Sequence, residues 1–547
     1  MAKAPSVTKS NTQTKAKILP PGSLKLSLFD PDMDLLLRAG IGGLATTLLA
    51  IEQQDQPFFC DGISPDSDPP WVVSKDSITL TFPDPTDVAS YFEPIFKFAF
   101  GLHNHLIDLQ PTYVRGQRPE PQTLARLQQG LMLTFFQHGK SRTGEKEDIE
   151  LNYEVDGKQA RYSMRRLHGY KHQTGYNDLI EKGCLSIKAT ELPGTLYPGA
   201  AVRHNAYSSS TKYEATTSQV LAALFAPIGT LSFSINRGSA VLMVPEVLDL
   251  LQFAKLRPHA TPQNDRQCQI GSIGDAVLGL YATLRANDAQ LKLTVPSITA
   301  YLFLPTAWAS QQKSRVASKQ IESLDDHSLG IFQQASEYLP SRLASRTVKE
   351  SVGKGKAKVT TERVEAFWTT SVVRPLIADN LAEKRPWFSG FTRLFLASDP
   401  ANGKPLRDRL SFERLGLHKM VQGNVWDHDG QRALVVAVHH ALRGRYGQIA
   451  KENEANRVAM QNRFRGEYDK WRLAFSGAKT ADQFRFSLCD LMSRVPANKE
   501  LQTNWSVVIP MLSGNDWQLA RDLSLLALAS YQGKEQPTPD DTSTDAP

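Results

Sequence analysis

Basic and aromatic side chains are concentrated in residues 161–172, which hold six Arg, Lys or His residues and two Tyr residues. Guanidinium groups bond phosphates in pairs, and Tyr or His rings stack on bases for about 1–3 kcal/mol per base. The segment therefore predicts contact with a nucleic acid. The side chains expected to make this contact are Arg161, Arg165, Arg166, His168 and Lys171. The alternative is an exposed edge strand that its charges protect from pairing with another chain.

A second group of the same kind is Arg203-His204-Asn205. In a DNA groove, Arg pairs with guanine and Asn pairs with adenine through two hydrogen bonds each. The group therefore predicts base contacts, although three residues carry little specificity by themselves.

Cations also stand beside aromatic residues at Lys384-Arg385, which precede Trp387 and Phe388. A rigid loop at this position would present two cations next to two rings to a nucleic acid. The plain alternative is that Trp387 and Phe388 are buried in a core.

A basic stripe is expected on the helical segment 449–475, where Arg463 and Arg465 are the residues predicted to contact nucleic acid. Such a stripe suits a protein that follows a phosphate backbone. Long surface helices also carry one for solubility alone, and this alternative stays open.

Catalytic and metal-binding motifs were sought, and one candidate stands out. Asp427-His428-Asp429, with His439 and His440 downstream, resembles part of an HD-type phosphohydrolase site for a divalent ion. The further ligands that such an enzyme needs are not evident. The glycines at 40, 42 and 43 lack the Lys-Ser or Lys-Thr of a phosphate loop. The prediction is therefore a protein with no catalytic residue, no metal and no cofactor.

Composition points to a basic binding protein of two or three domains, since 547 residues exceed what one core usually serves. The net charge of +7 favours an anionic partner. The four cysteines are scattered without a Cys-x-x-Cys pair, which excludes a zinc ribbon and fits a reducing cytoplasm. No secretory signal and no uncharged apolar stretch of 18 residues are found, so we expect a cytoplasmic protein without membrane association.

The chain is expected to have an α+β fold, with an irregular mixed N-terminal region containing small sheets and an all-α C-terminal helical bundle. The predicted domains are a basic arm (1–22), a mixed α+β domain (23–255), a connecting region (256–410) with a basic mobile loop (341–363), a helical bundle (411–532) and a disordered tail (533–547).

Local patterns predict several elements within these domains. Gly40 and Gly43 lie on one face of an apolar helix, which should let a second helix approach closely. Strands are expected at 71–73, 78–82 and 231–235, a helix at 276–285 and an extended segment at 291–295. The bundle should consist of four helical segments, 432–446, 449–475, 481–495 and 516–531.

The order of these features resembles a known family. A glycine-bearing helix that begins with Arg38-Ala39-Gly40 is followed by a hairpin that starts at Trp71. This order resembles the start of the large subunit of type I CRISPR Cascade complexes, in the Myxococcus-like branch related to type I-B. Some cyanobacterial CRISPR-guided transposons carry the same branch. Further similarity lies in residues 197–205, 224–229 and 244–250.

The resemblance implies a non-catalytic subunit that recognises the protospacer-adjacent motif, contacts the 5′ handle region of the guide RNA and stabilises the R-loop through its bundle. Pairing with the guide then supplies most of the sequence specificity. The implied partners are guide RNA, double-stranded target DNA, and the backbone, handle-binding and small helical Cascade subunits. A transposition adaptor serves as a further partner in a transposon system, and a helicase-nuclease in a defence system.

Two other classes of function remain open at this point. One is an HD-type nuclease or phosphohydrolase that uses His428 and Asp429. The other is an adaptor that contacts only proteins. The resemblance also implies a second, shorter product of the same gene, because Met420 begins a segment of the size and character of the small helical subunit, with Met460 as the less favoured start.

Overall fold

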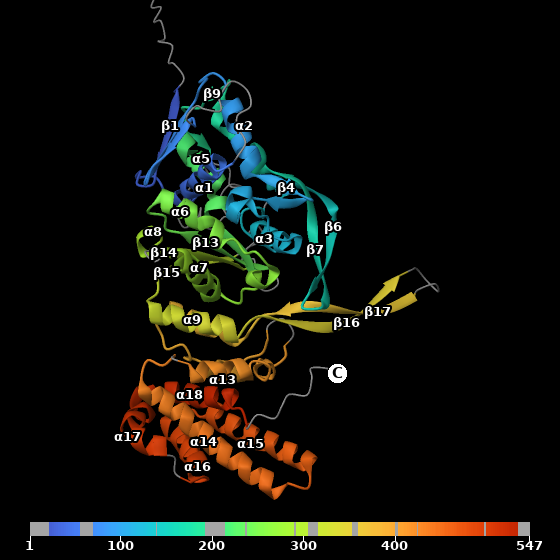
Figure 1. Ribbon diagram of the computed structural model, residues 1–547, viewed down its shortest axis with the longest axis vertical. Helices are drawn as coiled ribbons and strands as arrows, with labels where there is room; N and C mark the ends of the chain where they lie inside the picture. The colour runs from blue at the N-terminus through green and yellow to red at the C-terminus, as the bar shows by residue number, and fades with distance from the viewer. Residues whose placement is uncertain are drawn as a thin grey trace, which may run out of the picture.

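The computed structural model describes residues 21–54, 69–137, 139–191, 214–235, 238–288, 291–304, 315–352, 359–399, 403–423, 425–496 and 499–533. Along the long axis of the molecule, a mixed N-terminal part is followed by connecting helices and then by a helical bundle (Figure 1). The α+β fold predicted from the sequence is confirmed. The predicted domain boundaries stay predictions, and the expected arm and tail lie almost entirely outside the described residues.

Two apolar helices, α1 (Leu35–Glu52) and α5 (Thr217–Gly229), pack against each other in the N-terminal part. A Cβ atom on Gly40 would lie 1.9 Å from the carbonyl oxygen of Ala222, and one on Gly43 would lie 2.3 Å from that of Phe225. The close helix approach predicted from the glycine spacing is therefore confirmed. Helix α1 is long and apolar enough to span a membrane, but 72% of it is buried, as in the core helix of a soluble fold.

Two antiparallel sheets surround this helix pair. The smaller sheet has the order β1-β3-β2, with β1 (Ser23–Ser27), β3 (Ser77–Thr81) and β2 (Trp71–Val73). It contains the predicted Trp-led hairpin. The larger sheet has the order β12-β13-β14-β15, with β12 (Leu231–Ile235), β13 (Ser239–Pro245), β14 (Ser297–Leu304) and β15 (Arg315–Glu322). Helices α2 (Val88–Ala99), α3 (Pro121–Leu133), α6 (Leu250–Leu256) and α7 (Ile273–Asn287) complete this part.

The prediction of an extended segment at 291–295 is wrong, because α8 (Leu291–Thr294) forms one helical turn there before β14 begins. Three short two-stranded ribbons decorate the N-terminal part. They are β4 (Gly101–His103) with β5 (Leu106–Asp108), β8 (Ile180–Glu181) with β9 (Cys184–Leu185), and β10 (Thr190–Glu191) with β11 (Glu214–Ala215).

A third sheet combines two long hairpins in the order β16-β17-β7-β6. Its strands are β6 (Arg142–Val155), β7 (Lys158–Tyr170), β16 (Arg342–Val352) and β17 (Val359–Thr369). The basic loop expected at 341–363 is therefore wrong for most of its length, because cross-strand partners outside the segment stabilise a polar hairpin there. The Gly-Lys-Gly-Lys stretch itself lies outside the described residues. Figure 1 shows the hairpin projecting from the side of the molecule.

The C-terminal bundle contains five described helices where the sequence predicted four segments. These are α14 (Asp429–Glu452), α15 (Arg457–Gly477), α16 (Ala481–Ser493), α17 (Lys499–Leu512) and α18 (Trp517–Ser530). The connection expected between the segments 481–495 and 516–531 is wrong, because α17 fills most of it, and Pro510 lies close to the helix end. The break expected between the segments 432–446 and 449–475 is also wrong, because α14 continues through Gly444 and Gly447 to Glu452.

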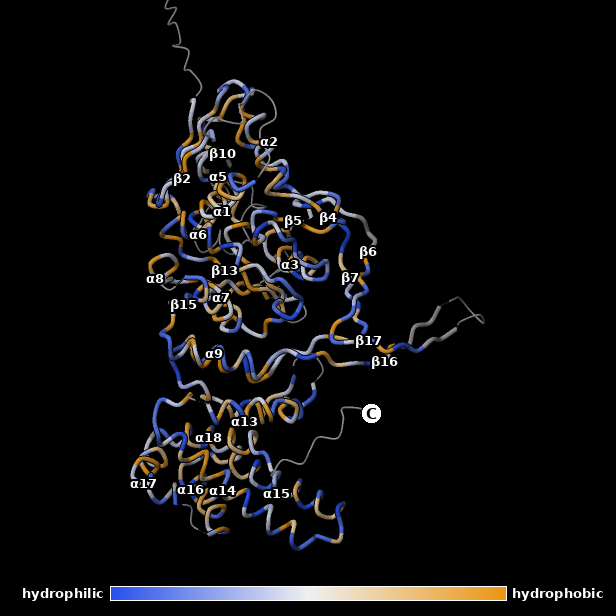
Figure 2. Tube along the Cα trace, viewed as in Figure 1, coloured by the Kyte–Doolittle hydropathy of each residue, from blue (hydrophilic) through white to orange (hydrophobic). Residues whose placement is uncertain are grey.

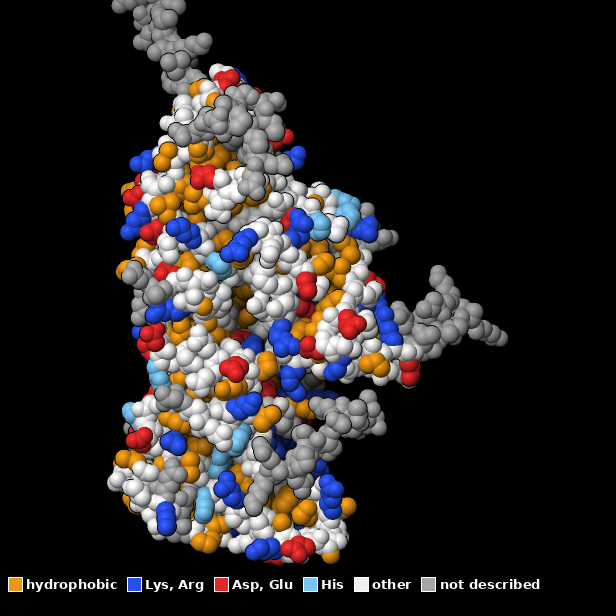
Figure 3. All heavy atoms as spheres, viewed as in Figure 1, with side chains coloured by type: hydrophobic (Ala, Val, Ile, Leu, Met, Phe, Trp, Pro, Cys, Tyr) orange, Lys and Arg blue, Asp and Glu red, His pale blue; other side chains and the backbone are white. Residues whose placement is uncertain are grey.

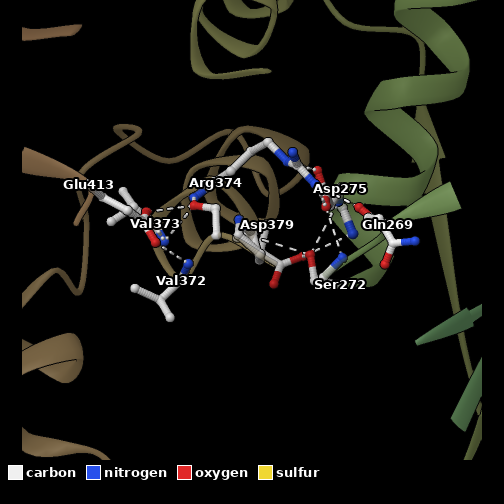
Figure 4. A network of polar contacts seen from close by, with 12 residues as sticks. Gln269, Ser272, Asp275, Val372, Val373, Arg374, Asp379 and Glu413 are labelled. Atoms are coloured by element: carbon white, nitrogen blue, oxygen red, sulfur yellow. Dashed lines mark hydrogen bonds and ion pairs between the residues drawn. The ribbon is translucent and has the colours of Figure 1, made fainter. Parts of the chain in front are cut away.

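Polar contacts join the bundle to the N-terminal part through the connecting helices α9 (Asp326–Tyr338), α10 (Val373–Ala382), α11 (Thr392–Leu396), α12 (Arg407–Leu410) and α13 (Arg414–Gln422). Arg374 of α10 donates two hydrogen bonds to Asp275 of α7, at 2.8 and 2.9 Å (Figure 4). Glu413, just before α13, accepts from Ser371 at 2.6 Å and from the backbone N–H of Val372 at 2.8 Å. These buried charges fix α10 against both neighbours.

One hydrophobic core cluster runs from α1 to α18, and a smaller one lies beneath the third sheet. The smaller cluster consists of Leu106, Tyr113, Leu124, Ala125 and Met164, with Leu151 and Tyr162 packed against it. It holds the middle of β7 against β5 and α3. Hydrophilic residues predominate along β6 and β7 in Figure 2, so the third sheet is buried on one face only.

Candidate nucleic-acid interface

Strand β7, which carries most of the predicted site residues, is an interior strand of the third sheet. It pairs antiparallel with β6 along its length and parallel with β17 at Ala160 and Ala366. The β6 side of β7 is paired along the strand, whereas the β17 side is paired only at Ala160. The alternative of a charge-protected edge strand therefore stays open for the part of β7 beyond Ala160, which carries the predicted residues.

The side chains of β7 alternate between the two faces of the sheet. Ala160 and Met164 are buried toward the body of the protein, whereas Arg161, Ser163 and Arg165 lie on the opposite face. We call this opposite side of β6, β7, β17 and β16 the outer face. The local sequence thus places two of the predicted arginines on the same face of the strand, with Ser163 between them.

Each of these arginines forms an ion pair with a carboxylate of a neighbouring strand on the outer face. Arg161 contacts Glu150, and Arg165 Nε lies 3.3 Å from Asp148 Oδ1. On the other hairpin, Arg346 lies 3.2 Å from Glu365 and 5.4 Å from the centre of the Phe367 ring. Ion pairs of this kind on a protein surface contribute about 0–1 kcal/mol to stability. A phosphate group can therefore replace the carboxylate at little cost.

The remaining predicted residues of this segment lie beyond an irregularity in the strand. The register between β6 and β7 shifts between Gly144 and Asp148, opposite Arg166. Past this bulge, the exposed His168 packs edge-on against His105, with ring centres 5.4 Å apart. Lys171 belongs to the next turn and lies 3.1 Å from Asp178. The structure therefore separates Lys171 from the arginines of the outer face.

A buried carboxylate, Asp265, fixes the inner face of the sheet to the body. It accepts hydrogen bonds from Arg126 at 2.9 Å, from the Tyr153 hydroxyl at 2.7 Å and from the Trp368 indole at 2.6 Å. Burial, together with the Asp265 carboxylate, raises the pKa of Tyr153, so the phenol stays protonated as a donor. Because these donors come from α3, β6 and β17, Asp265 holds both hairpins in one orientation.

The second predicted group, Arg203-His204-Asn205, lies outside the described residues. The third, Lys384-Arg385, is on the surface, where Lys384 lies 2.9 Å from Glu322 and Arg385 contacts Glu383. Trp387 and Phe388 are almost fully buried, so the plain alternative is correct for the two rings and they cannot stack on a base.

The predicted residues of the bundle lie apart from the sheet, on α15. Arg463 is exposed and forms an ion pair of 2.8 Å with Glu452. Arg465 lies on the wall of a pocket together with Arg472, another cation of the predicted basic stripe, and with Arg407 and Arg414, which the sequence did not single out. No local signal could identify this group, because its members come from three helices.

The residues of the HD-type alternative do not converge. His428 immediately precedes α14, and Asp427 lies 3.6 Å from His327. His439 is partly buried, with its Nε2 atom 2.9 Å from the Ala527 carbonyl oxygen, and desolvation lowers its pKa to about 4. Among the residues that the structure describes, no group of three or more His, Cys, Asp or Glu side chains could hold a metal ion.

Comparison with known proteins gives two domain matches and one long relative. The DevT N-terminal domain matches residues 25–224, and the DevT C-terminal domain matches residues 422–546. The chain is 33% identical over 538 residues to the CRISPR-associated protein Cas8a1/Csx13 of Myxococcus xanthus (strain DK1622), covering 94% of this chain and 89% of the relative. This identity confirms the resemblance inferred from the sequence. The chain therefore belongs to the Cas8 family of large subunits of CRISPR Cascade complexes.

Proposed function

We propose that this Cascade large subunit is a non-catalytic protein that recognises the protospacer-adjacent motif of target DNA through the outer face. The observation that carries the proposal is the arrangement of Arg161, Arg165 and Arg346 on one side of a sheet whose other side Asp265 fixes. A rigid array of guanidinium groups suits paired hydrogen bonds to phosphates and to guanine edges.

Contact with nucleic acid would exchange the existing ion pairs for phosphate contacts. The carboxylates of Glu150, Asp148 and Glu365 would be released to water, and counterions would leave the DNA. Such binding weakens steeply with salt, which separates this proposal from an adaptor that contacts only proteins. The region around Arg203-His204-Asn205 remains the second proposed contact with the motif.

The rest of the proposed role follows from membership of a Cascade complex, in which the subunit assembles with other Cascade subunits and nucleic acids. We expect it to contact the 5′ handle region of the guide RNA and to stabilise the R-loop through the bundle, next to the small helical subunits. In a type I-B defence system the assembled complex would recruit a helicase-nuclease. In RNA-guided transposition it would recruit a transposition adaptor. The proposed location is the cytoplasm.

The test compares the double variant Arg161→Ala/Arg165→Ala with Arg285→Ala in the assembled complex. Arg285 of α7 serves as a single-charge control, because it forms a similar surface pair of 3.2 Å with Asp326 of α9. Binding to motif-bearing duplex should fall about tenfold or more for the double variant and stay unchanged for the control. The dependence of log affinity on log salt should also become shallower by about 2.

Two results would count against the proposal in different ways. Equal affinities of the double variant and the control for the duplex would remove the outer face as a DNA contact. An equal loss on duplexes with and without the motif would show that the face contacts the backbone but does not read the motif.

A further inference from the structure

A pocket of about 790 Å³ opens between α12–α13 and the bundle helices α14, α15 and α18. Its volume lies within the range of sites for small ligands. Figure 3 shows Lys and Arg side chains around the hollowed side of the molecule between the β16–β17 hairpin and the bundle. The pocket combines cationic and aromatic walls, and its residues come from segments far apart in the chain.

The cationic wall has more positive than negative charge. Arg407, Arg414, Arg465 and Arg472 line the pocket, against the two carboxylates of Asp408 and Asp469. Arg472 is held by Asp469 at 2.9 Å. Within the described part of the chain, neither Arg414 nor Arg465 has a carboxylate at ion-pair distance. These two exposed guanidinium groups therefore remain available to an anion.

The aromatic wall is already assembled. The Tyr446 ring lies 5.1 Å from the Phe464 ring and 5.4 Å from the Tyr531 ring, measured between centres. Tyr446 and Tyr468 are half-buried, and burial raises the pKa of both phenols, which keeps their hydroxyl groups protonated as donors. A flat, apolar ligand could lie on these rings without reorganising them.

The cationic wall and the aromatic wall together indicate which class of ligand fits the pocket. Unpaired arginines fit a phosphate, and a fixed cluster of rings fits a base that is not stacked in a duplex. A peptide carboxylate would use the arginines but leave the rings without a partner. A paired base could not reach the rings, because a duplex keeps its bases stacked.

We propose that this pocket holds one nucleotide of a single-stranded nucleic acid, with its phosphate at Arg414 and Arg465 and its base against Tyr446 and Phe464. The inference deepens the proposed function and rests on it, since it assigns the strand contact of the bundle to a defined site. DNA and RNA share this chemistry, so both are tested.

The test uses the full chain and fluorescent 15-nucleotide oligothymidine and oligouridine, with binding followed by anisotropy. Arg414→Gln/Arg465→Gln should weaken binding of the preferred strand by at least about tenfold. Arg432→Gln/Lys451→Gln is the matched control, because it removes the same charge from exposed positions of α14 outside the pocket lining. The control should change binding less than about threefold. Equal losses for both double variants would overturn the inference and leave only general attraction to a basic surface.

A second experiment tests the contact between the base and the aromatic wall. An abasic strand of the same length should bind the wild-type chain more weakly than the normal strand. Phe464→Leu removes the ring without changing the charge of the pocket, so it should abolish this difference. Equal binding of abasic and normal strands by the wild-type chain would contradict insertion of a base.

The experiments can reject the proposal for the pocket and the proposal for the outer face independently of each other. Normal binding of single strands by the Arg414→Gln/Arg465→Gln variant, with loss of duplex binding in the outer-face variant, would reject the pocket alone. Unchanged duplex binding by the outer-face variant would reject the proposed function, whatever the single-strand assay shows.

Discussion

At the scale of single residues, the N-terminal core holds a buried histidine that has no polar partner among the described residues. The His172 ring is fully buried between Phe100 and Phe136, and neither ring nitrogen makes a hydrogen bond. Burial, together with the nearby Lys171 charge, lowers the pKa of His172 to about 3. The folded protein therefore keeps this ring neutral, whereas the unfolded chain takes up a proton near pH 6.5.

This difference predicts how stability depends on pH. The contribution of His172 is fully present above pH 6.5 and decreases as the pH falls toward 3, because only the unfolded state binds the proton. Between pH 7 and pH 5 the loss should be about 2 kcal/mol. Denaturant unfolding at both pH values should show a smaller loss for His172→Phe than for the wild type. The same loss in both proteins would contradict the assignment to His172.

At the scale of elements, the contact between α1 and α5 depends on missing side chains. A Cβ atom at Gly43 would come 2.3 Å from a backbone carbonyl oxygen of α5, and backbone cannot move aside as a flexible side chain can. Gly279 of α7 is also helical, but nothing lies within 4 Å of a Cβ atom added there. Substitution by alanine at these two positions therefore distinguishes the effect of helix packing from the effect of helix propensity.

Gly43→Ala should lower the free energy of unfolding by about 1–3 kcal/mol, through the forced separation of two packed helices. Gly279→Ala should raise it by about 0.5–1 kcal/mol, because alanine favours the helix and meets no neighbour. Chemical denaturation measures both values. A destabilised Gly279→Ala variant would show that the two changes share a cause other than the helix contact.

The same elements show which features the sequence could predict. The helix α1, the Trp71 hairpin and the larger part of the bundle follow from local spacing, which acts within a few residues. The β16–β17 hairpin is polar on both faces along much of its length, so it lacks the alternation that marks a strand. The Asp265 contacts join residues 126, 153 and 368, which no pattern along the chain relates.

At the scale of the whole molecule, the internal start predicted at Met420 falls inside α13, and its side chain is buried. A product that begins there would contain all five bundle helices but would lose most of α13, which packs on α18. The DevT C-terminal domain match begins at residue 422, close to this methionine. The short product would therefore need another surface to cover α18, such as a neighbouring Cascade subunit.

Expression with a C-terminal tag should give a second band that contains residues 420–547, and Met420→Leu should remove it. Leucine has nearly the same volume as methionine, so the full-length protein should remain folded with less than about 1.5 kcal/mol of change. An unchanged short band in the Met420→Leu variant would exclude this start, and its loss in Met460→Leu would move the start to that residue.

The ion pairs of the outer face have a further consequence for the free subunit. Each arginine there already holds an internal competitor for phosphate, so a strand that touches one of them gains only the small difference between two similar contacts. A rigid ligand that spans Arg161, Arg165 and Arg346 together exchanges all three pairs in a single event. The free subunit should therefore bind RNA weakly when the RNA contacts only one of these arginines. Its affinity should increase with the length of phosphate backbone that contacts all three.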